Sequence, residues 1–460
     1  MNFLNLSFIS LLAFYSLVSP HHSAWAKSQP YLAVGKAKAK KTIMAFPSIK
    51  ISKKESGSKS IAQAIHKVVK NDLVFMDLFK FLGPEGYIEK TEKAGLLPDK
   101  FKFSDWTTVK VQILLKTGIE VKEGKITLNA YLYDVEKGKQ IISKKLIAST
   151  KDQQTLGHTL ANEVVEALTG LPGIFLTKIA MACDRTGKKE VYIMNFDGSA
   201  VKQITSHRSN AFAPAWSPDG TKLAYSLYTR HHKKKESGQK ITKKNMDLYE
   251  FDFKTRSIRL LSNRKGINSG AHYHPSGKSI ALTMSFLGNP EIFSLDRKTR
   301  RATRLTKSWG FDVDPAWSPD GKKLAYVSSK TGKPMIFVMN ADGSSKKRLT
   351  YAGRYNSTPA WSPQSQKIAF AGWLDKGFDI FTINPDGTNI QRLTKKQGSN
   401  EDPDFSPDGN FIAFSSDRTG KRNIYVMNVD GSYVKRLTYG LGNCSTPRWS
   451  NPAQATRPAP

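Results

Sequence analysis

The chain has 460 residues, which is enough for two domains, each with its own hydrophobic core. A hydrophobic content of 39% with 24 Phe and 8 Trp excludes wholesale disorder, and a count of 2 Cys excludes a disulfide scaffold or a cysteine-rich zinc site. The formal charge of +33 favours anionic partners such as nucleic acid, phospholipid, lipopolysaccharide or an acidic protein, although a generally basic proteome would give the same surface.

The first predicted element is an export signal. Residues 3–18 are almost all apolar, which matches a signal h-region and is short for a stable membrane span. Ala24-Trp25-Ala26 then provides a small-x-small cleavage site, so we expect a signal peptide at 1–26 and a mature chain from Lys27. The region before the apolar run has no Lys or Arg, and an uncleaved anchor is the alternative. No later segment approaches about eighteen apolar residues, so we expect the mature protein to be soluble.

Residues 27–170 are predicted to form a small α/β domain. Its last helix is the clearest, because Leu or Val recurs at every fourth position from Leu156 to Leu168 and Gly170 provides a C-terminal stop. Apolar periodicity predicts the other elements. In chain order we expect a strand at 42–46, a helix at 58–71, strands at 109–115, 126–133 and 140–147, and a helix at 155–168.

The second part of the chain is a repeat. An aromatic residue follows a short polar and Pro-containing stretch at Trp216, Tyr273, Trp317, Trp361, Phe405 and Trp449, at intervals of 57, 44, 44, 44 and 44 residues. A downstream pair of an apolar residue and Thr or Ser keeps the same intervals, from Ile204-Thr205 to Leu437-Thr438. A period in the low forties with short alternating strands is typical of β-propeller blades, which stack around an axis because one blade cannot bury its own apolar face.

One period contains four strands. In the repeat around Trp317 we expect an inner strand at 314–318, a Pro-Asp-Gly turn, a second strand at 323–328, a third at 335–339 and an outer strand at 347–350. The last copy stops at 449–450, and its missing strands are found at 178–205. The propeller, at 171–460, should therefore have six blades, and 178–205 should share the sixth with 444–450. The whole chain is predicted to be a two-domain α+β protein.

The two cysteines meet in that shared blade. Cys444 should begin the inner strand beside the end of the next strand at Cys183. If the chain is exported, a disulfide there would lock the ring and add roughly 2–4 kcal/mol. Two buried free thiols are the alternative.

The order of these parts resembles a known family. The helix LGHTLANEVVEALTG at 156–170, the segment TKIAMACDRTGKKEVYIMNFDGS at 177–199 and the blades of the form PAWSPDGxKLAY are similar to the TolB family of the Tol–Pal envelope system. The resemblance covers nearly the entire chain. It implies a periplasmic, non-enzymatic adaptor without a cofactor. It also implies a role in outer-membrane integrity and in constriction at cell division.

The resemblance implies two protein partners. The propeller would bind a peptidoglycan-associated lipoprotein (Pal), and the mature N-terminal segment, with Tyr31, Leu32 and Val34, would contact a TolA-like inner-membrane protein. The Lys-rich sequence KSQPYLAVGKAKAKK at 27–41 departs from the family pattern there. The alternative function is a secreted propeller that binds, or hydrolyses, cell-wall glycan. Nucleic acid is not expected as a partner of an exported protein.

Polar residues before each inner strand are the candidates for partner binding. They occupy equivalent places at one mouth of the predicted channel, and they are Asn210, Asn268, Asp312, Asn356, Asn400 and Asn443. We interpret them as a hydrogen-bonding rim, with turn stabilisation as the alternative.

Acidic pairs suggest further chemistry. Asp312 and Asp314 would share one face of a strand, as would Asp402 and Asp404, and Asp314 and Asp402 are weak candidates for a cation such as Ca²⁺. Paired carboxylates are also the requirement of a glycoside hydrolase. No nucleophile elbow, HExxH or GxGxxG sequence occurs, so no catalytic residue is assigned.

A pair of histidines and a basic insertion are two further features of the repeat. His272 and His274 alternate and would share a strand face, but two His without a carboxylate favour packing or a polar lining over a metal site. The first blade carries thirteen extra residues in TRHHKKKESGQKITKKN at 229–245. This insertion is either a solvated loop or a contact with an anionic envelope surface through Lys233, Lys234 and Lys235.

Overall fold

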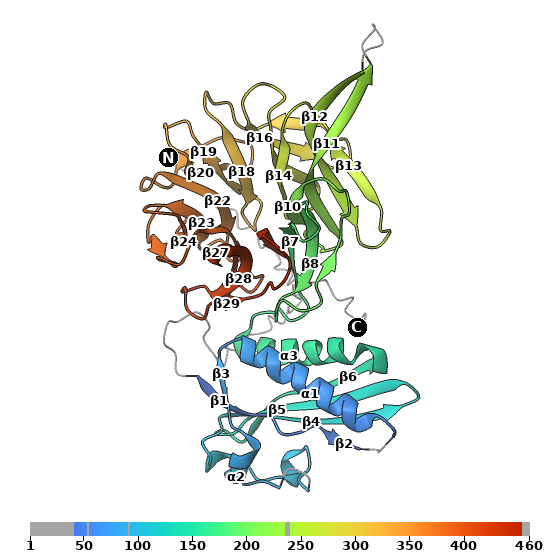
Figure 1. Cartoon of the computed structure of the whole chain (residues 1–460). Helices are drawn as coiled ribbons and strands as arrows, with labels where there is room; N and C mark the ends of the chain where they lie inside the picture. The colour runs from blue at the N-terminus through green and yellow to red at the C-terminus, as the bar shows by residue number, and fades with distance from the viewer. Residues whose placement is uncertain (1–40, 53–54, 91–92, 235–239, 453–460) are drawn as a thin grey trace, which may run out of the picture.

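The computed structural model describes residues 41–452 except 53–54, 91–92 and 235–239. The predicted signal peptide at 1–26 and the N-terminal partner segment with Tyr31, Leu32 and Val34 lie outside the described residues. Within them, no helix is long and apolar enough to cross a membrane. Figure 1 shows a sheet-and-helix unit below a ring of strands.

The N-terminal unit is one sheet covered by two long helices. The sheet has the strand order β3-β1-β4-β5-β6, and β2 pairs with β4. Helices α1 and α3 lie on the sheet face that is turned toward the propeller (Figure 1). The bounds are β1 Thr42–Ala45, β2 Lys50–Ile51, α1 Ser58–Phe75, β3 Phe79–Phe81, α2 Ser104–Thr107, β4 Ile113–Lys122, β5 Lys125–Asp134, β6 Lys139–Ser149 and α3 Gln153–Thr169.

Two predicted elements in this unit have different bounds. Helix α1 continues to Phe75, because Leu73 and Phe75 extend its buried stripe. The strand predicted at 109–115 is wrong in its first half, because Lys110 has a left-handed φ of 60° and the chain turns there before β4 begins at Ile113. Gly170 ends α3 in the left-handed conformation, with φ 71°, as its C-terminal position requires.

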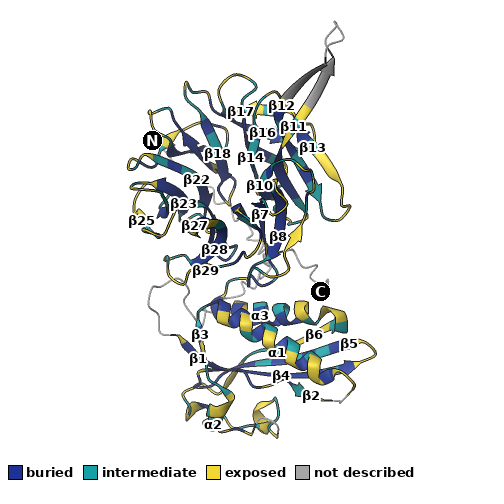
Figure 2. Ribbon diagram, viewed as in Figure 1, coloured by how far each residue is buried: buried dark blue, intermediate teal, exposed yellow. Residues whose placement is uncertain are grey.

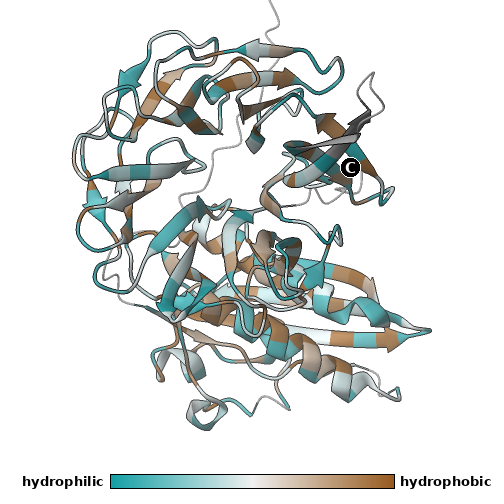
Figure 3. Cartoon of the chain, turned by 45° about the horizontal axis from the view of Figure 1, so that its top comes forward, coloured by the Kyte–Doolittle hydropathy of each residue, from teal (hydrophilic) through white to brown (hydrophobic). Residues whose placement is uncertain are grey.

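Six four-stranded antiparallel sheets form the propeller, which is seen as a ring in Figure 3. Numbered in order around the ring, the first blade is β10 Ala211–Trp216, β11 Lys222–Lys234, β12 Lys240–Asp252 and β13 Ile258–Ser262, and the second is β14 Asn268–Tyr273, β15 Ser279–Met284, β16 Glu291–Asp296 and β17 Ala302–Arg304. The third blade is β18 Asp312–Trp317, β19 Lys323–Ser328, β20 Met335–Asn340 and β21 Lys347–Arg348, and the fourth is β22 Tyr355–Trp361, β23 Ile368–Trp373, β24 Phe378–Ile383 and β25 Gln391–Arg392. The fifth blade is β26 Asn400–Phe405, β27 Phe411–Thr419, β28 Lys421–Asn428 and β29 Lys435–Arg436, and the sixth is β30 Cys444–Trp449, β7 Lys178–Cys183, β8 Glu190–Asn195 and β9 Lys202–Gln203.

The sixth blade joins the two ends of the propeller. Its inner strand β30 pairs with β7, which comes from the other end of the domain, and the register places Cys444 opposite Cys183. The ring is therefore closed by backbone hydrogen bonds between segments that are more than 250 residues apart in sequence.

The repeated Trp residues connect neighbouring blades. The indole N–H of Trp361 donates to the backbone carbonyl of Ala316 in the preceding blade, at 3.0 Å, and Trp216 donates to Arg448 in the same way, also at 3.0 Å. The second and third strands of the blades are mostly buried and appear as dark ribbons in Figure 2, whereas the outer strands are more exposed. The aromatic position of the repeat is thus a blade-to-blade contact, which explains its regular spacing.

Each inner strand contains a β-bulge at the same position of the repeat. The register shifts between its two halves, and one residue there has a left-handed φ: Ala213, Gly270, Asp314, Thr358, Asp402 and Thr446. A bulge turns the residues on either side of it to different faces. Successive side chains of the inner strands therefore do not simply alternate between the two faces of the sheet at the channel wall.

The two units share one continuous core. The ring of Phe75, at the end of α1, lies 4.9 Å from that of Phe196 and 5.2 Å from that of Phe411, measured between centroids. Phe175, in the connection between the units, lies 5.2 Å from Phe196. Phe196 follows the third strand of the sixth blade and Phe411 begins the second strand of the fifth. The N-terminal unit therefore packs on the propeller face that carries the Pro-Asp-Gly turns, which we call the turn face.

Candidate functional site

Four of the six residues predicted to form a hydrogen-bonding rim are buried. The side chains of Asn268, Asp312, Asn356 and Asn400 are at most 2% exposed. The prediction that these four present polar groups to solvent is wrong, because each is buried, and the amides of Asn268, Asn356 and Asn400 bond to the preceding blade. Partner binding at this mouth stays a prediction.

The buried amides are used internally. The amide of Asn356 donates to Thr350 Oγ1 at 2.9 Å and to the carbonyl of Ala352 at 3.0 Å. Asn268 accepts from Ser262 Oγ at 2.7 Å and donates to the carbonyl of Met246 at 2.8 Å. These bonds link the last strand of one blade to the first strand of the next, so these residues stabilise the ring.

The two remaining Asn lie at the sixth and first blades. Asn443 is exposed but donates to Asp184 Oδ2 at 3.0 Å. Asn210 accepts from the backbone N–H of Lys189 at 3.2 Å, and among the described residues its amide nitrogen donates to none. Asn210 therefore keeps free donors at this mouth.

Exposed apolar side chains mark the same face of the propeller. The loops before the inner strands and those between the second and third strands both lie at the end opposite the turn face, and we call this end the loop face. Four exposed side chains in these loops and one at the end of β23 form what we call the aromatic rim, which includes one leucine: Leu287, Trp309, Tyr351, Tyr439 and, in β23, Trp373. Trp309 and Tyr351 are 74% and 71% exposed. Exposed aromatics gathered on one face mark an interaction surface.

The aromatic rim follows the repeat. Four successive blades repeat the sequence Arg-Leu-Thr, and the residue after it alternates between Lys and Tyr: Lys307, Tyr351, Lys395 and Tyr439. The guanidinium of Arg348 lies 4.6 Å from the ring centroid of Tyr351, and that of Arg436 lies 4.5 Å from Tyr439. These contacts hold the rings in place. Sequence reasoning used the apolar-Thr pair as a register mark and missed the residue that follows it.

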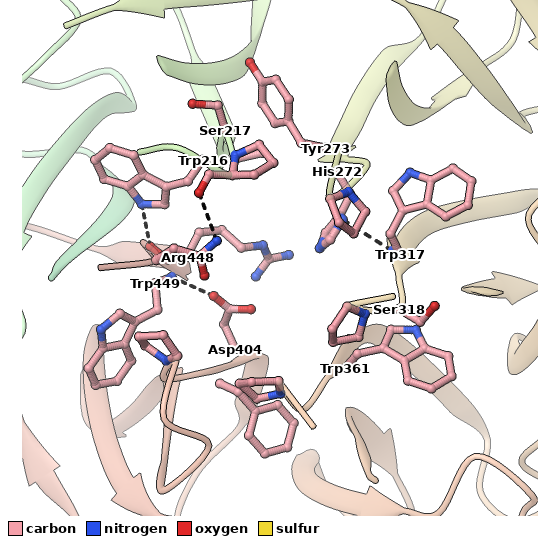
Figure 4. Close-up of a pocket in the computed structure, with 18 residues that line it drawn as sticks. Trp216, Ser217, His272, Tyr273, Trp317, Ser318, Trp361, Asp404, Arg448 and Trp449 are labelled. Atoms are coloured by element: carbon pink, nitrogen blue, oxygen red, sulfur yellow. Dashed lines mark hydrogen bonds between the residues drawn. The ribbon is translucent and has the colours of Figure 1, made fainter. Parts of the chain in front are cut away.

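The central channel has a charged interior at its turn-face end. In Figure 4 the side chain of Arg448 extends into the channel between Asp404 and His272. Rings of Pro and Trp from all six blades surround it in a cavity of about 380 Å³. The backbone N–H of Trp449 donates to Asp404 Oδ2 at 2.6 Å.

The acidic residues of the channel come from two blades. Asp314, Asp402 and Asp404 all line it. Asp402 Oδ2 accepts from the backbone N–H of Thr446 at 3.1 Å. Asp312 is not with them, because the bulge at Asp314 turns it into the blade. The prediction that Asp312 and Asp314 share a face is therefore wrong. Among the described residues no group of three metal-ligating side chains is suited to hold a metal ion, so Asp314 and Asp402 carry no metal assignment.

His272 and His274 do not share a strand face. Strand β14 ends at Tyr273, and His274 lies in the following turn, where its Nδ1 is 2.8 Å from Ser276 Oγ. His272 lines the channel, and burial lowers its pKa to about 4, with Arg448 adding to the effect. It is therefore a neutral lining residue, and the prediction of a common face is wrong.

The burial of Asp314 in the channel predicts a pH-dependent stability. Burial raises the pKa of Asp314 to about 6, with Asp402 adding to the shift and Arg448 opposing it. The folded protein then binds more protons than the unfolded chain between about pH 4 and 6, so its stability falls as pH rises through that window. We expect Asp314→Asn to unfold at least roughly 3 °C above the parent at pH 7.5 and close to it at pH 4, as measured by thermal unfolding.

The matched control for this prediction is Asp320→Asn in an exposed turn. A hydrogen bond from Ser318 lowers the pKa of Asp320, so its removal should lower the unfolding temperature at pH 7.5. Equal unfolding temperatures of Asp314→Asn and the parent at both pH values would contradict the assignment.

A disulfide joins Cys183 and Cys444, with an S–S distance of 2.06 Å. Of the two alternatives left open by the sequence, the structure contains the bridge. It links β7 to β30 at their loop-face end and closes a sequence separation of 261 residues.

The insertion in the first blade lengthens a hairpin. Strands β11 and β12 pair along their whole length, from Lys222 opposite Asp252 at the base to Lys234 opposite Lys240 at the far end. Lys233 and Lys234 belong to β11 by backbone, and Lys235 lies outside the described residues. Contact of these three lysines with an anionic surface stays a prediction.

The protein matches two family models. The model of the TolB amino-terminal domain matches residues 30–141, and that of the TolB beta propeller domain matches residues 165–372 and 355–455. Together they cover both structural units. The propeller match alone spans more than half of the chain.

Curated relatives and a solved structure agree with the models. The chain is 33% identical over 230 residues to the Tol-Pal system protein TolB of Desulfosudis oleivorans, which covers 50% of this chain and 49% of the relative. It is 31% identical over 311 residues to the Protein TolB homolog of Chlorobium luteolum, which covers 61% of this chain and 70% of the relative. The chain thus spans about half or less of the length of several relatives that it matches.

The structural comparison supports the fold. The crystal structure of TolB from Acinetobacter baumannii matches with a TM-score of 0.74 at 24% identity, covering 92% of this chain and 100% of that one. Since both family models match in the same order as the two units of the structure, the chain belongs to the TolB family.

Proposed function

We propose that this chain is a non-catalytic adaptor of a Tol–Pal system, located in the periplasm, that binds a Pal-like lipoprotein on its loop face. Curated relatives are named Tol-Pal system proteins, and this supports a role in that envelope system. The observation that carries the binding proposal is the aromatic rim, because solvent-exposed Trp and Tyr side chains beside Arg are the residues that dominate protein interfaces.

The described N-terminal unit does not cover the loop face. The N-terminal unit packs on the opposite face through Phe75 and Phe411, so it leaves the aromatic rim uncovered. Lys307 and Lys395 alternate with Tyr351 and Tyr439 around the rim and are exposed. This arrangement fits a partner with an apolar patch surrounded by acidic groups.

A second partner is proposed for the N-terminal region. The segment with Tyr31, Leu32 and Val34 precedes β1, whose first residue is Thr42. We propose that it contacts a TolA-like inner-membrane protein. Deletion of residues 27–40 should abolish that contact in a pull-down with the soluble TolA-like domain and leave binding at the loop face unchanged. Loss of both contacts would contradict two separate partner sites.

An adaptor role is proposed rather than catalysis of glycan hydrolysis. The channel carboxylates of Asp402 and Asp404 accept hydrogen bonds from the backbone N–H groups of Thr446 and Trp449. They are thus engaged in joining the fifth blade to the sixth. We propose that the protein acts through its two binding regions in maintaining outer-membrane integrity and in constriction at division.

The test is a calorimetric titration of the protein with the soluble domain of the Pal-like lipoprotein from the same organism. We expect saturable one-to-one binding that persists at physiological salt. Trp309→Ala and Tyr351→Ala should each weaken it by at least roughly thirtyfold, which corresponds to about 2 kcal/mol for an aromatic anchor.

The matched control is Ile390→Ala, which removes a side chain that is 52% exposed near the turn face. It should leave the affinity unchanged. Binding seen only at low salt, or equal losses for Tyr351→Ala and Ile390→Ala, would sink the proposed site. Bulky substitutions of Asn356 or Asn400 are unsuitable, because both side chains are buried and such variants would report on folding.

A further inference from the structure

The β11–β12 hairpin leaves the blade as a free two-stranded ribbon. Figure 1 shows it extending beyond the rest of the propeller. Strand β10 pairs with β11 only as far as Leu227, and β13 pairs with β12 only from Leu248 onward. Tyr228 and Met246 still donate backbone hydrogen bonds to Asn210 and Gly266, and from the Arg230/Lys244 pair outward β11 and β12 pair with each other.

Like charges lie opposite each other at the base of this ribbon. Arg230 is the register partner of Lys244, and both side chains are exposed. Directly opposed like charges destabilise an antiparallel pair by repulsion. The ribbon thus concentrates positive charge at a place where the fold gains nothing from it, and an anion bound there would offset the repulsion.

A cleft of about 900 Å³ lies at the root of the ribbon, and we call it the basic cleft. Three separate segments contribute its cations, which are Lys188, Arg208, Arg230 and Lys244. All four are exposed, and none of them forms an ion pair with a carboxylate among the described residues. Among the described residues that line the cleft, none is acidic.

The nearest acidic groups are engaged beneath the surface. Glu190 is buried, and its two oxygens accept from Thr205 Oγ1 at 2.5 Å and from the backbone N–H of Arg208 at 2.9 Å. Asp247 is also buried and accepts from Asn245 Nδ2 at 2.6 Å. The cations of the cleft therefore face solvent without a counter-charge from the part of the chain that the structure describes.

The uncharged lining is suited to a sugar. Asn210 offers the free amide donors described above, and Tyr228, which is 46% exposed, and Tyr249 also line the cleft. A tyrosine ring packs against the C–H face of a sugar while its hydroxyl stays in water. A volume of several hundred Å³ accommodates a ligand the size of one or two sugar rings.

From these features we infer that the basic cleft binds a phosphorylated sugar, with arginines 208 and 230 on its phosphates and Asn210 and Tyr228 on its ring. Four cations match two phosphate monoesters, each of which carries about −1.5 to −2 charge at pH 7. The forked guanidinium of arginine suits phosphate oxygens in pairs. The phosphorylated sugar is either free or the headgroup of a lipid, and the experiment distinguishes these sources.

The test uses two probes with the purified full chain. One is glucose 1,6-bisphosphate, and the other is phosphatidylcholine vesicles containing lipid A, whose headgroup is a bisphosphorylated glucosamine disaccharide. We expect saturable binding of both, with the soluble compound displacing the protein from the vesicles. Arg208→Gln/Arg230→Gln should weaken both at least tenfold. Binding of the soluble probe alone would assign the site to free sugar phosphates.

The matched control is Arg300→Gln/Arg301→Gln, which removes two exposed arginines on the turn face. Arg300 has a left-handed φ of 58°, like Arg208 at 54°, so the two variants make equal backbone demands. Equal weakening by the control, or equal binding to phosphatidylglycerol vesicles, would show that net charge alone binds and would overturn the inference. Pyrophosphate binding as tightly as the sugar bisphosphate would overturn the sugar assignment. The Pal titration depends on other residues, so either proposal can fail alone.

Discussion

Removal of the Cys183–Cys444 disulfide is expected to lower the stability of the propeller by about 4 kcal/mol. The bridge joins residues separated by 261 positions, so in the unfolded chain it restrains a very long loop. It also lies where β30 and β7 close the ring, so its loss lets the two ends of the domain separate more readily. For a domain of this size, the unfolding temperature should fall by roughly 7 °C.

The measurement is thermal unfolding of Cys183→Ser, Cys444→Ser and the double variant. All three should lose the same amount, because each lacks the same bond. A reducing agent should lower the unfolding temperature of the parent and leave that of the double variant unchanged. An unfolding temperature of the double variant within about 2 °C of the parent would contradict a stabilising role for the bridge.

Phe75→Ala is expected to uncouple the N-terminal unit from the propeller. The ring of Phe75 is 4% exposed and packs between Phe196 and Phe411. Truncation of a buried Phe costs about 3–5 kcal/mol, and here most of that cost falls on the contact between the units. We expect the single unfolding transition to split in two.

Cleavage by chymotrypsin measures the uncoupling directly. Phe175 is buried in the connection against Phe196, so cleavage after it requires the units to separate. Phe75→Ala should increase its rate at least tenfold. Val74→Ala is the matched control, because the neighbouring Val74 is 47% exposed and should have no effect. An unchanged rate in Phe75→Ala would mean that the units are held by other contacts.

Only those parts of the candidate sites that are formed by residues close together in the sequence could be predicted from it. The alternation of Lys307, Tyr351, Lys395 and Tyr439 is visible in the repeat and needed only attention to the residue after each Arg-Leu-Thr. The basic insertion was visible as a charge run, but the cleft at its root was not. That cleft includes Lys188 and Arg208, which come from the sixth blade and from its connection to the first, and only ring closure brings them to the hairpin.

Periodicity in the sequence determined the number of blades, because the aromatic and apolar-Thr positions of each repeat contact the next blade and so recur with it. It also predicted the closure of the sixth blade, since the missing strands of the last copy had to come from before the first. What only the tertiary structure decided is the orientation of side chains at the channel wall. The residue with the left-handed φ varies from Ala213 to Thr358 and Asp402, and although Pro follows it in five of the six blades, periodicity alone did not reveal a bulge there. The close approach of six strands around one axis imposes the bulge, and the bulge sends Asp312 into the blade and Asp314 into the channel.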